Sequence, residues 1–258
     1  MKKYTFLALF ILFQITISCS RKPNYGPPNV DFNRIKRSFS EWWVYHNKSI
    51  ILSSNFIALD SQSNRISKDL FLKNLTSGEY IPLKLTASDS IYYELFKLDQ
   101  GSDKTIPEVI KQSGEEAYKN FKLEGKPFPK FSFRDLNGIE YTSENTKGKI
   151  VLIKCWFIAC APCIEEFPRL NELVEKYKNR SDIVFISLAF DKQEALDSFL
   201  LKNSFHYAVV PDQKQFVFYD LDVKAYPTHF IVDKNGIIRK VVTKADEMID
   251  ALEHDMLH

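Results

Sequence analysis

The sequence predicts an α/β fold in which a central mixed sheet is flanked by helices and preceded by a small mixed α+β module. Beyond residue 125, near-continuous apolar runs alternate with helical segments, which indicates a sheet covered on both faces. The turn KNG at 234–236 is followed by IIRKVV, which predicts a hairpin that closes an antiparallel edge of this sheet. Residues 34–104 are instead rich in aromatic and β-branched side chains without this regular alternation.

The main sheet has four clear strand candidates and one covering helix. The strands are predicted at VLIKCWF (151–157), IVFISLAF (183–190), YAVV (207–210) and THFIVD (228–233). The final segment, 245–257, should form a helix, because its apolar side chains share one face. These side chains are Ala245, Met248, Ile249 and Leu252.

The module at 34–104 contains the stretches WWVYHNKSIIL, YIPLKL and SIYYELFKL, whose composition is typical of strands. A short helix is predicted from Ser67 to Leu75, stopped by Gly78. Large aromatics in a small module usually belong to its core, so Trp42, Trp43 and Tyr45 are expected there rather than on a binding platform. The role of this module is not predicted.

A linker helix is predicted over 105–124. Thr105 precedes Ile106-Pro107, and Glu108 follows three residues after Thr105, which is a helix-start signal with threonine as the cap. The helix should run toward Asn120 and connect the small module to the domain at 125–258.

The first residues predict an export signal. Lys2 and Lys3 precede a charge-free apolar run of fifteen residues, Tyr4 to Ser18. A helix that crosses a membrane needs roughly twenty such residues, so a cleaved signal is favoured over a permanent transmembrane anchor. Residues 20–33 combine proline, glycine and asparagine, which predicts a tether between a membrane and the folded chain.

The end of this signal, TISC at 16–19, resembles the lipobox of bacterial lipoproteins, in which the cysteine carries the lipid after cleavage. The resemblance implies a lipoprotein-type signal peptide over 1–19 and lipidation at Cys19. The expected location is therefore the bacterial cell envelope, facing the periplasm, with a lipid anchor in the inner or outer membrane. Ordinary secretion, with Cys19 removed or unmodified, is the alternative.

The charge balance argues against a nucleic-acid partner. The chain has 35 Lys and Arg against 33 Asp and Glu, and removal of residues 1–18, which hold two lysines and no acids, leaves 33 of each. Nucleic-acid binding needs a large basic excess on one face, and the only short basic cluster is at 34–37.

The cysteines point to thiol chemistry. Cys19, Cys155, Cys160 and Cys163 are the only ones, so the chain is no disulfide scaffold. Cys160 is placed where a strand ends and a helix begins, so free N–H groups and the positive helix terminus favour its thiolate and make it the expected nucleophile. Cys163 aligns with the predicted buried stripe of that helix, formed by Phe167, Leu170, Val174 and Tyr177.

This arrangement predicts disulfide exchange. Cys160 would attack a substrate disulfide to form a mixed disulfide, and Cys163 would then be deprotonated and displace the reduced product. Glu166, on the same helical side as Cys163, is the candidate acid/base. Lys154 either pairs with Glu166 or extends toward solvent. Cys155 should face away from Lys154 in the strand and be a small core residue.

Three separated motifs resemble those of one family. WFIACAPCIEEFP is similar to the active-site segment W-x-x-x-C-x-P-C-x-x-E-x-P of the TlpA/ResA-like thioredoxins. GKPFPKFSFRDLNG with KGKIVLIKCWF precedes it, and AYPTHFIVDKNG follows it, so the resemblance covers about residues 125–258. It implies a thioredoxin-like fold and thiol-disulfide oxidoreductase activity.

The resemblance also implies roles for individual residues. The Tyr226-Pro227 bond should be cis, with the Tyr226 backbone pairing to a substrate strand beside the cysteines. Pro168 matches the family's helix-kinking proline, and Glu166 matches its acidic residue near the buried cysteine. The expected substrate-contacting residues are Trp156, Ala161, Pro162, Tyr226 and Pro227. No metal and no cofactor is expected beyond the redox-active disulfide of Cys160 and Cys163.

The dipeptide Ala161-Pro162 favours reduction or isomerisation over disulfide donation, because strong oxidants of this fold often place a histidine between the cysteines. The expected partners are exported proteins with disulfides and a membrane electron donor or thiol partner.

Three other functions remain open. A zinc or copper site would need Cys155 or His229 beside the cysteine pair, and no second C-x-x-C or paired histidines are present. A thiol peroxidase of this fold has a threonine three residues before its reactive cysteine, where Phe157 stands. A chaperone-like protein would use the module at 34–104 as its binding part.

Overall fold

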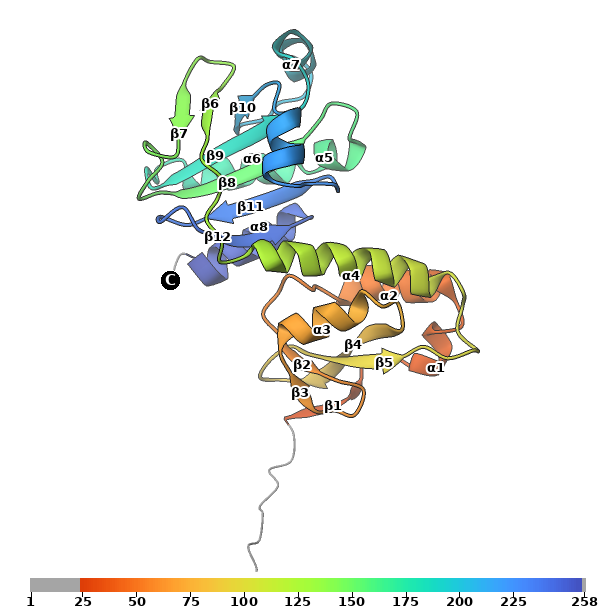
Figure 1. Ribbon diagram of the computed structural model, residues 1–258. Coiled ribbons are helices and arrows are strands. Elements are labelled where there is room, and N and C mark those ends of the chain that lie inside the picture. The colour runs from red at the N-terminus through yellow and green to blue at the C-terminus, as the bar shows by residue number, and fades with distance from the viewer. Residues whose placement is uncertain (1–23, 257–258) are drawn as a thin grey trace, which may run out of the picture.

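Two layered bodies joined by one long helix make up the chain, for which the computed structural model describes residues 24–256 (Figure 1). The predicted signal peptide at 1–19, the predicted lipidation site at Cys19 and the start of the predicted tether lie outside the described residues. Within the described part of the chain, no helix has the length and apolar character needed to cross a membrane.

The N-terminal body is a five-stranded sheet in the order β1-β4-β5-β2-β3, covered by helices. Its strands are β1 (Tyr25–Pro28), β2 (Ile57–Leu59), β3 (Arg65–Ile66), β4 (Tyr80–Ala87) and β5 (Tyr92–Lys97). Its helices are α1 (Phe32–Ile35), α2 (Phe39–Ser49) and α3 (Lys68–Leu75). The predicted helix at Ser67 to Leu75 is confirmed, with the Ser67 hydroxyl accepting from the Leu70 N–H at 3.1 Å.

The predicted tether is wrong for its described part, residues 24–33. β1 pairs antiparallel with β4 at the edge of the sheet, and α1 follows it directly. An edge strand tolerates proline because one side of its backbone needs no ladder partner. The proline-rich composition therefore marks an edge strand here, and the N-terminal body begins at β1.

The segment WWVYHNKS lies in α2 and is not a strand. Ser38 caps this helix, with its hydroxyl accepting from the Glu41 N–H at 3.4 Å. Trp42 and His46, one helical turn apart, are both buried. Aromatic residues favour strands only where they fit a pleated surface, and here a cap and a helical spacing of buried side chains prevail.

The three aromatics of this segment have different surroundings. Trp42 is 0% exposed and lies in the core, as predicted. Trp43 is 42% exposed, so the prediction of a core position is wrong for this residue. Tyr45 is half-buried, and its hydroxyl accepts a hydrogen bond from the Lys84 N–H at 2.8 Å.

The long helix α4 (Ile106–Leu123) lies between the two bodies (Figure 1). It extends past the predicted end near Asn120. The predicted threonine cap is wrong, because Thr105 has helical backbone angles and makes no side-chain cap bond. The Thr105 N–H instead donates to the Asp103 carboxylate at 2.9 Å, which fixes the turn before the helix.

α4 packs on both bodies and so is more than a connection. Gly114 of α4 lies against Leu75 of α3, so closely that a Cβ at 114 would be 2.8 Å from the Leu75 backbone carbon. On the other side, Lys119 forms an ion pair of 2.7 Å with Asp222 of the C-terminal body.

Gly114→Ala is expected to lower the free energy of unfolding by about 1–2 kcal/mol. The gain in helix propensity, about 1 kcal/mol, is outweighed by forcing α3 and α4 apart, since overpacking costs about 1–3 kcal/mol or more. Urea denaturation measures the difference. Gln112→Ala, an exposed change on the same helix, should stay within about 0.5 kcal/mol. Equal or greater stability of Gly114→Ala would contradict the close α3–α4 contact.

The C-terminal body is a mixed five-stranded sheet in the order β10-β9-β8-β11-β12. Its strands are β8 (Ile150–Trp156), β9 (Ile183–Ala189), β10 (Ala208–Val210), β11 (Thr228–Val232) and β12 (Ile238–Val242), and a separate hairpin is formed by β6 (Ser132–Arg134) and β7 (Glu140–Thr142). Its helices are α5 (Ala161–Glu165), α6 (Phe167–Tyr177), α7 (Gln193–Leu200) and α8 (Ala245–Ala251), with π-helical turns at Phe216–Asp220 and Leu252–Met256. β11 and β12 form the predicted antiparallel edge.

Alternation along β8 divides the core of this body between two faces. Leu152 packs with residues of α6 and α8, which cover one face. Ile153 and Cys155 pack on the other face, against Phe128 and the π-helical turn at Phe216–Asp220. Both faces of the sheet are therefore covered, which explains why its central strand is buried along its whole length.

Candidate active site

The cysteine pair lies at the junction between β8 and α5. Cys160 directly precedes α5, and its carbonyl accepts the N–H groups of Cys163 at 3.0 Å and Ile164 at 3.2 Å. Cys160 and Cys163 form a disulfide. Cys160 is 6% exposed and Cys163 is 0% exposed, so an attacking group reaches the first sulfur and not the second.

The loop before Cys160 is held by the end of the neighbouring strand. The Ile158 N–H donates to the Asp191 carboxylate at 2.7 Å, and the Phe190 N–H donates to the Trp156 carbonyl at 3.2 Å. Asp191 was not predicted, because it follows β9 and nothing in its local sequence indicates that it reaches this loop.

The loop before β11 lies beside the cysteines. β11 pairs antiparallel with β8, with Thr228 opposite Cys155, so the residues just before β11 adjoin the end of β8. The Tyr226-Pro227 peptide bond in this loop is cis, as the resemblance implies. The Tyr226 ring packs on Phe157 with ring centroids 5.6 Å apart.

The residues expected to contact substrate do not all reach the surface. Ala161 and Pro162 are exposed, Tyr226 is half-buried and Pro227 is buried. The prediction for Trp156 is wrong, because its side chain is 0% exposed and lies among Phe167, Phe199 and Phe205. Trp156 is the last residue of β8, and its side chain points into the core. It therefore stabilises the site from inside the protein.

A buried ion pair lies at the break between α5 and α6. Glu166 stands at this break, and its side chain is 16% exposed. One carboxylate oxygen accepts Lys154 Nζ at 2.5 Å and His229 Nε2 at 3.0 Å, and the other accepts the Ala245 N–H at 2.8 Å. Of the two alternatives for Lys154, pairing with Glu166 is thus the one the structure shows.

These contacts decide the protonation states of the cluster. Burial raises the pKa of Glu166, but the hydrogen bonds from His229 and Lys154 and the charge of Lys154 outweigh burial and bring that pKa to about 2. Burial, and then the charge of Lys154, lowers the pKa of His229, and these effects outweigh the hydrogen bond and charge of Glu166, which raise it. Glu166 is therefore ionised at neutral pH, and His229 is neutral.

The tautomer of His229 follows from its partner. An ionised carboxylate only accepts hydrogen bonds, so the ring donates from Nε2 to Glu166. Nδ1 is then an acceptor, and it has no partner among the described residues. The contact of His229 with Glu166 was not predicted, because neither the position of His229 in β11 nor its neighbours in the sequence indicate a carboxylate at the α5–α6 break.

Cys155 and His229, the two further candidates for a metal site, have other surroundings. Cys155 is 0% exposed and faces the opposite side of the sheet from Lys154, in the core as predicted. Burial also raises the pKa of the Cys155 thiol far above its ordinary value, so it stays protonated. His229 is engaged with Glu166. Within residues 24–256, no three His, Cys, Asp or Glu side chains gather in a metal-binding arrangement.

Comparisons with known proteins agree on one family for the C-terminal body. The AhpC/TSA family model matches residues 124–241. The chain is 32% identical over 120 residues to the thiol-disulfide oxidoreductase ResA of Bacillus cereus, a match that covers 46% of this chain and 69% of that relative. With ResA of Bacillus subtilis the identity is 29% over 136 residues, covering 52% of this chain and 74% of the relative.

Solved structures are similar to about half of the chain. The thioredoxin domain of a thiol-disulfide oxidoreductase from Bacteroides vulgatus is 22% identical, covers 50% of this chain and 95% of its own, and has a TM-score of 0.46. The N-terminal body lies outside the match to the family model. The chain belongs to the ResA family of thiol-disulfide oxidoreductases, and its C-terminal body has the thioredoxin-like fold.

Proposed function

We propose that Cys160 is the nucleophile and Cys163 the resolving thiol of this oxidoreductase. The Cys160 thiolate attacks a client disulfide, one client sulfur leaves as a thiol, and a mixed disulfide forms. The Cys163 thiolate then attacks Cys160, which releases the second client sulfur and closes the Cys160–Cys163 disulfide. This assignment rests on the disulfide between the two cysteines. Within it, Cys160 is 6% exposed and Cys163 is fully buried.

Glu166 is proposed to accept the proton of Cys163. It is ionised at neutral pH and lies three residues after Cys163, at the end of the same short helix. Because its pKa is about 2, it holds a proton only transiently. The exposed 16% of its side chain allows that proton to pass to water.

We further propose a class of client and a direction of exchange. The chain reduces or isomerises disulfides of exported proteins, and a membrane electron donor or thiol partner restores its own dithiol. Ala161 and Pro162 separate the cysteines, and neither side chain donates a hydrogen bond to the Cys160 thiolate. A less stabilised thiolate favours the reducing direction.

The proposed location is the cell envelope, with a lipid anchor at Cys19. The support is the apolar run after Lys2 and Lys3 and the lipobox-like TISC at 16–19. The N-terminal body begins at β1, a few residues after Cys19, so it would lie close to the membrane surface.

Equilibration with glutathione tests the proposed direction. We expect a reduction potential below about −200 mV for the Cys160–Cys163 pair, nearer to thioredoxin at about −270 mV than to a strong oxidant at about −120 mV. Alkylation and mass spectrometry across a series of glutathione buffers measure the oxidised fraction. A potential above about −150 mV would contradict the reducing direction. A Cys160 thiol inert to alkylation near pH 7 would contradict disulfide exchange altogether.

A further inference from the structure

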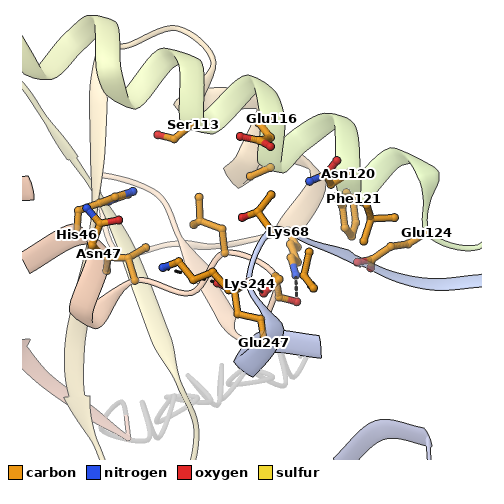
Figure 2. Close-up of a pocket in the computed structure, with 17 residues that line it drawn as sticks. His46, Asn47, Lys68, Ser113, Glu116, Asn120, Phe121, Glu124, Lys244 and Glu247 are labelled. Carbon is orange, nitrogen blue, oxygen red and sulfur yellow. Dashed lines mark hydrogen bonds and ion pairs between the residues drawn. The ribbon is translucent and has the colours of Figure 1, made fainter. Parts of the chain in front are cut away.

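A polar cleft of about 150 Å³ lies where the two bodies meet (Figure 2). Neither Cys160 nor Cys163 lines it. Its walls come from α2, α3 and α4 of the N-terminal side and from the β12–α8 turn of the C-terminal body. The charged side chains that line it include Lys68, Glu116, Glu124, Lys244 and Glu247. Charges of both signs therefore face one small space.

Two carboxylates lie on opposite walls of this cleft. Glu116 projects from α4 and Glu247 from α8 (Figure 2). Glu116 has no hydrogen bond or ion pair within the described residues, although its residue is half-buried. Burial raises the pKa of Glu116; the charge of Lys119 opposes this shift, and the charge of Glu247 adds to it. An ammonium group between the two carboxylates would relieve both effects that raise this pKa.

The other side of the cleft is suited to an anion. Lys244 Nζ points toward the side where His46 and Asn47 lie (Figure 2). Its nearest carboxylate oxygen, on Glu247, is at the limit of an ion pair, 4.0 Å away. The second lysine of the cleft is already engaged, because Lys68 Nζ donates to the backbone carbonyls of Ser53 and Ser54. Lys244 is thus the cation with a free donor.

His46 adds an independent sign that a ligand belongs here. Its ring stacks on Trp42 at 5.0 Å, and the residue is only 7% exposed. Nδ1 of this buried ring has no partner among the described residues, although His46 lines the cleft. A buried polar atom without a partner is uncommon in native proteins and calls for an explanation, such as a ligand atom that pairs with it.

We propose that this cleft binds a small zwitterion of the α-amino acid class. Its ammonium group lies between Glu116 and Glu247, and its carboxylate lies between Lys244 and His46. The volume supports a small ligand, since a cavity of about 150 Å³ holds a molecule the size of benzene. Glu247 already accepts a hydrogen bond from the Ser53 hydroxyl at 2.5 Å, whereas Glu116 and His46 Nδ1 have no partner among the described residues. A ligand with both charges pairs these two groups at once, whereas an ion of one sign leaves one of them without a partner.

Isothermal titration calorimetry of the purified full chain tests this proposal, with glycine, L-alanine and L-serine as probes. We expect saturable binding of at least one probe, and at least tenfold weaker binding of acetate and methylammonium, which each carry one of its charges. Glu116→Gln and Lys244→Gln should each weaken binding at least tenfold. Glu115→Gln, an exposed neighbour on α4 that does not line the cleft, should leave binding unchanged.

Two results would overturn the proposal. One is the absence of saturable heat from all three probes up to about 10 mM. The other is equal binding of a probe by the wild-type chain and by Glu116→Gln or Lys244→Gln. Thermal unfolding of each variant verifies that it is folded. His46→Asn replaces the ring whose Nδ1 has no partner, and it should also weaken binding of the probe at least tenfold. Disulfide exchange at Cys160 plays no part in these measurements.

Discussion

Cys163→Ala is expected to abolish turnover and to leave stable mixed disulfides between Cys160 and client proteins. Without the second sulfur, the Cys160 adduct has no intramolecular displacement to release it, while the first attack needs only Cys160. Steady-state reduction of a disulfide substrate should fall at least about a thousandfold, because resolution then depends on an external thiol. Insulin reduction measures the turnover, and non-reducing gels with mass spectrometry identify the adducts.

Two matched variants make this result specific. Cys155→Ala changes a buried thiol on the far face of the sheet, and its turnover should match that of the wild type. Adding Cys160→Ala to Cys163→Ala should remove every adduct, since the attacking sulfur is gone. Recovery of no adducts from Cys163→Ala alone, in the presence of a disulfide substrate, would count against the exchange mechanism.

Glu166→Gln is expected to lower the free energy of unfolding by about 3 kcal/mol. Lys154 has a side chain that is 0% exposed, and the variant leaves its ammonium buried with no negative partner. The amide oxygen can still accept hydrogen bonds from Lys154 and His229, but the amide NH2 group cannot accept from the Ala245 N–H, so the loss combines the charge with one hydrogen bond. Urea denaturation at pH 7 measures it. Glu165→Gln, the exposed neighbour, should change stability by less than about 0.5 kcal/mol.

The same charge predicts how acid destabilises the protein. Folding lowers the pKa of Glu166 from its ordinary 4.5 to about 2. A depressed carboxyl pKa contributes stability above pH 4.5 that is lost as the pH falls through 2, and here the contribution is about 3 kcal/mol. The wild type should therefore lose stability between these pH values more steeply than Glu166→Gln. Parallel curves would contradict the assigned ionisation of Glu166.

The variant also separates the two chemical steps. If Glu166 accepts the Cys163 proton, Glu166→Gln slows release of the mixed disulfide and leaves the first attack by Cys160 largely intact. Stopped-flow measurement of adduct formation and decay gives both rates. Equal slowing of both steps would show that Glu166 does not act on Cys163 in particular.

Short-range patterns were enough to predict the position of the cysteines. The apolar run of β8 and the three-residue spacing of the pair placed Cys160 at the strand–helix junction and Cys163 on the buried side of α5. These features depend on strand alternation and helix periodicity, which a sequence shows directly. The predicted buried stripe differs from the structure only in α6, which begins after Glu166. There Leu173 is buried, whereas Val174, which the stripe included, is partly exposed.

Patterns without a clear period were less informative. The segment around Trp42 was expected as a strand, yet capping by Ser38 and the burial of Trp42 with His46 make it a helix. Aromatic content by itself does not determine secondary structure, because packing decides which surface such residues fit. The edge strand β1 was missed for a related reason, since its prolines indicate a loop until a partner strand is present.

The sequence by itself determined the thioredoxin-like sheet, the order of its strands along the chain and the two cysteines at the end of β8. Only the tertiary structure decided what surrounds Glu166. Lys154 is 12 residues away, His229 is 63 and the Ala245 N–H is 79. Alternation showed which side of β8 Lys154 occupies, but the pairing of β8 with β11 and the packing of α8 bring its partners there. Such contacts depend on which distant segments of the chain meet in the fold, and no local sequence pattern shows this.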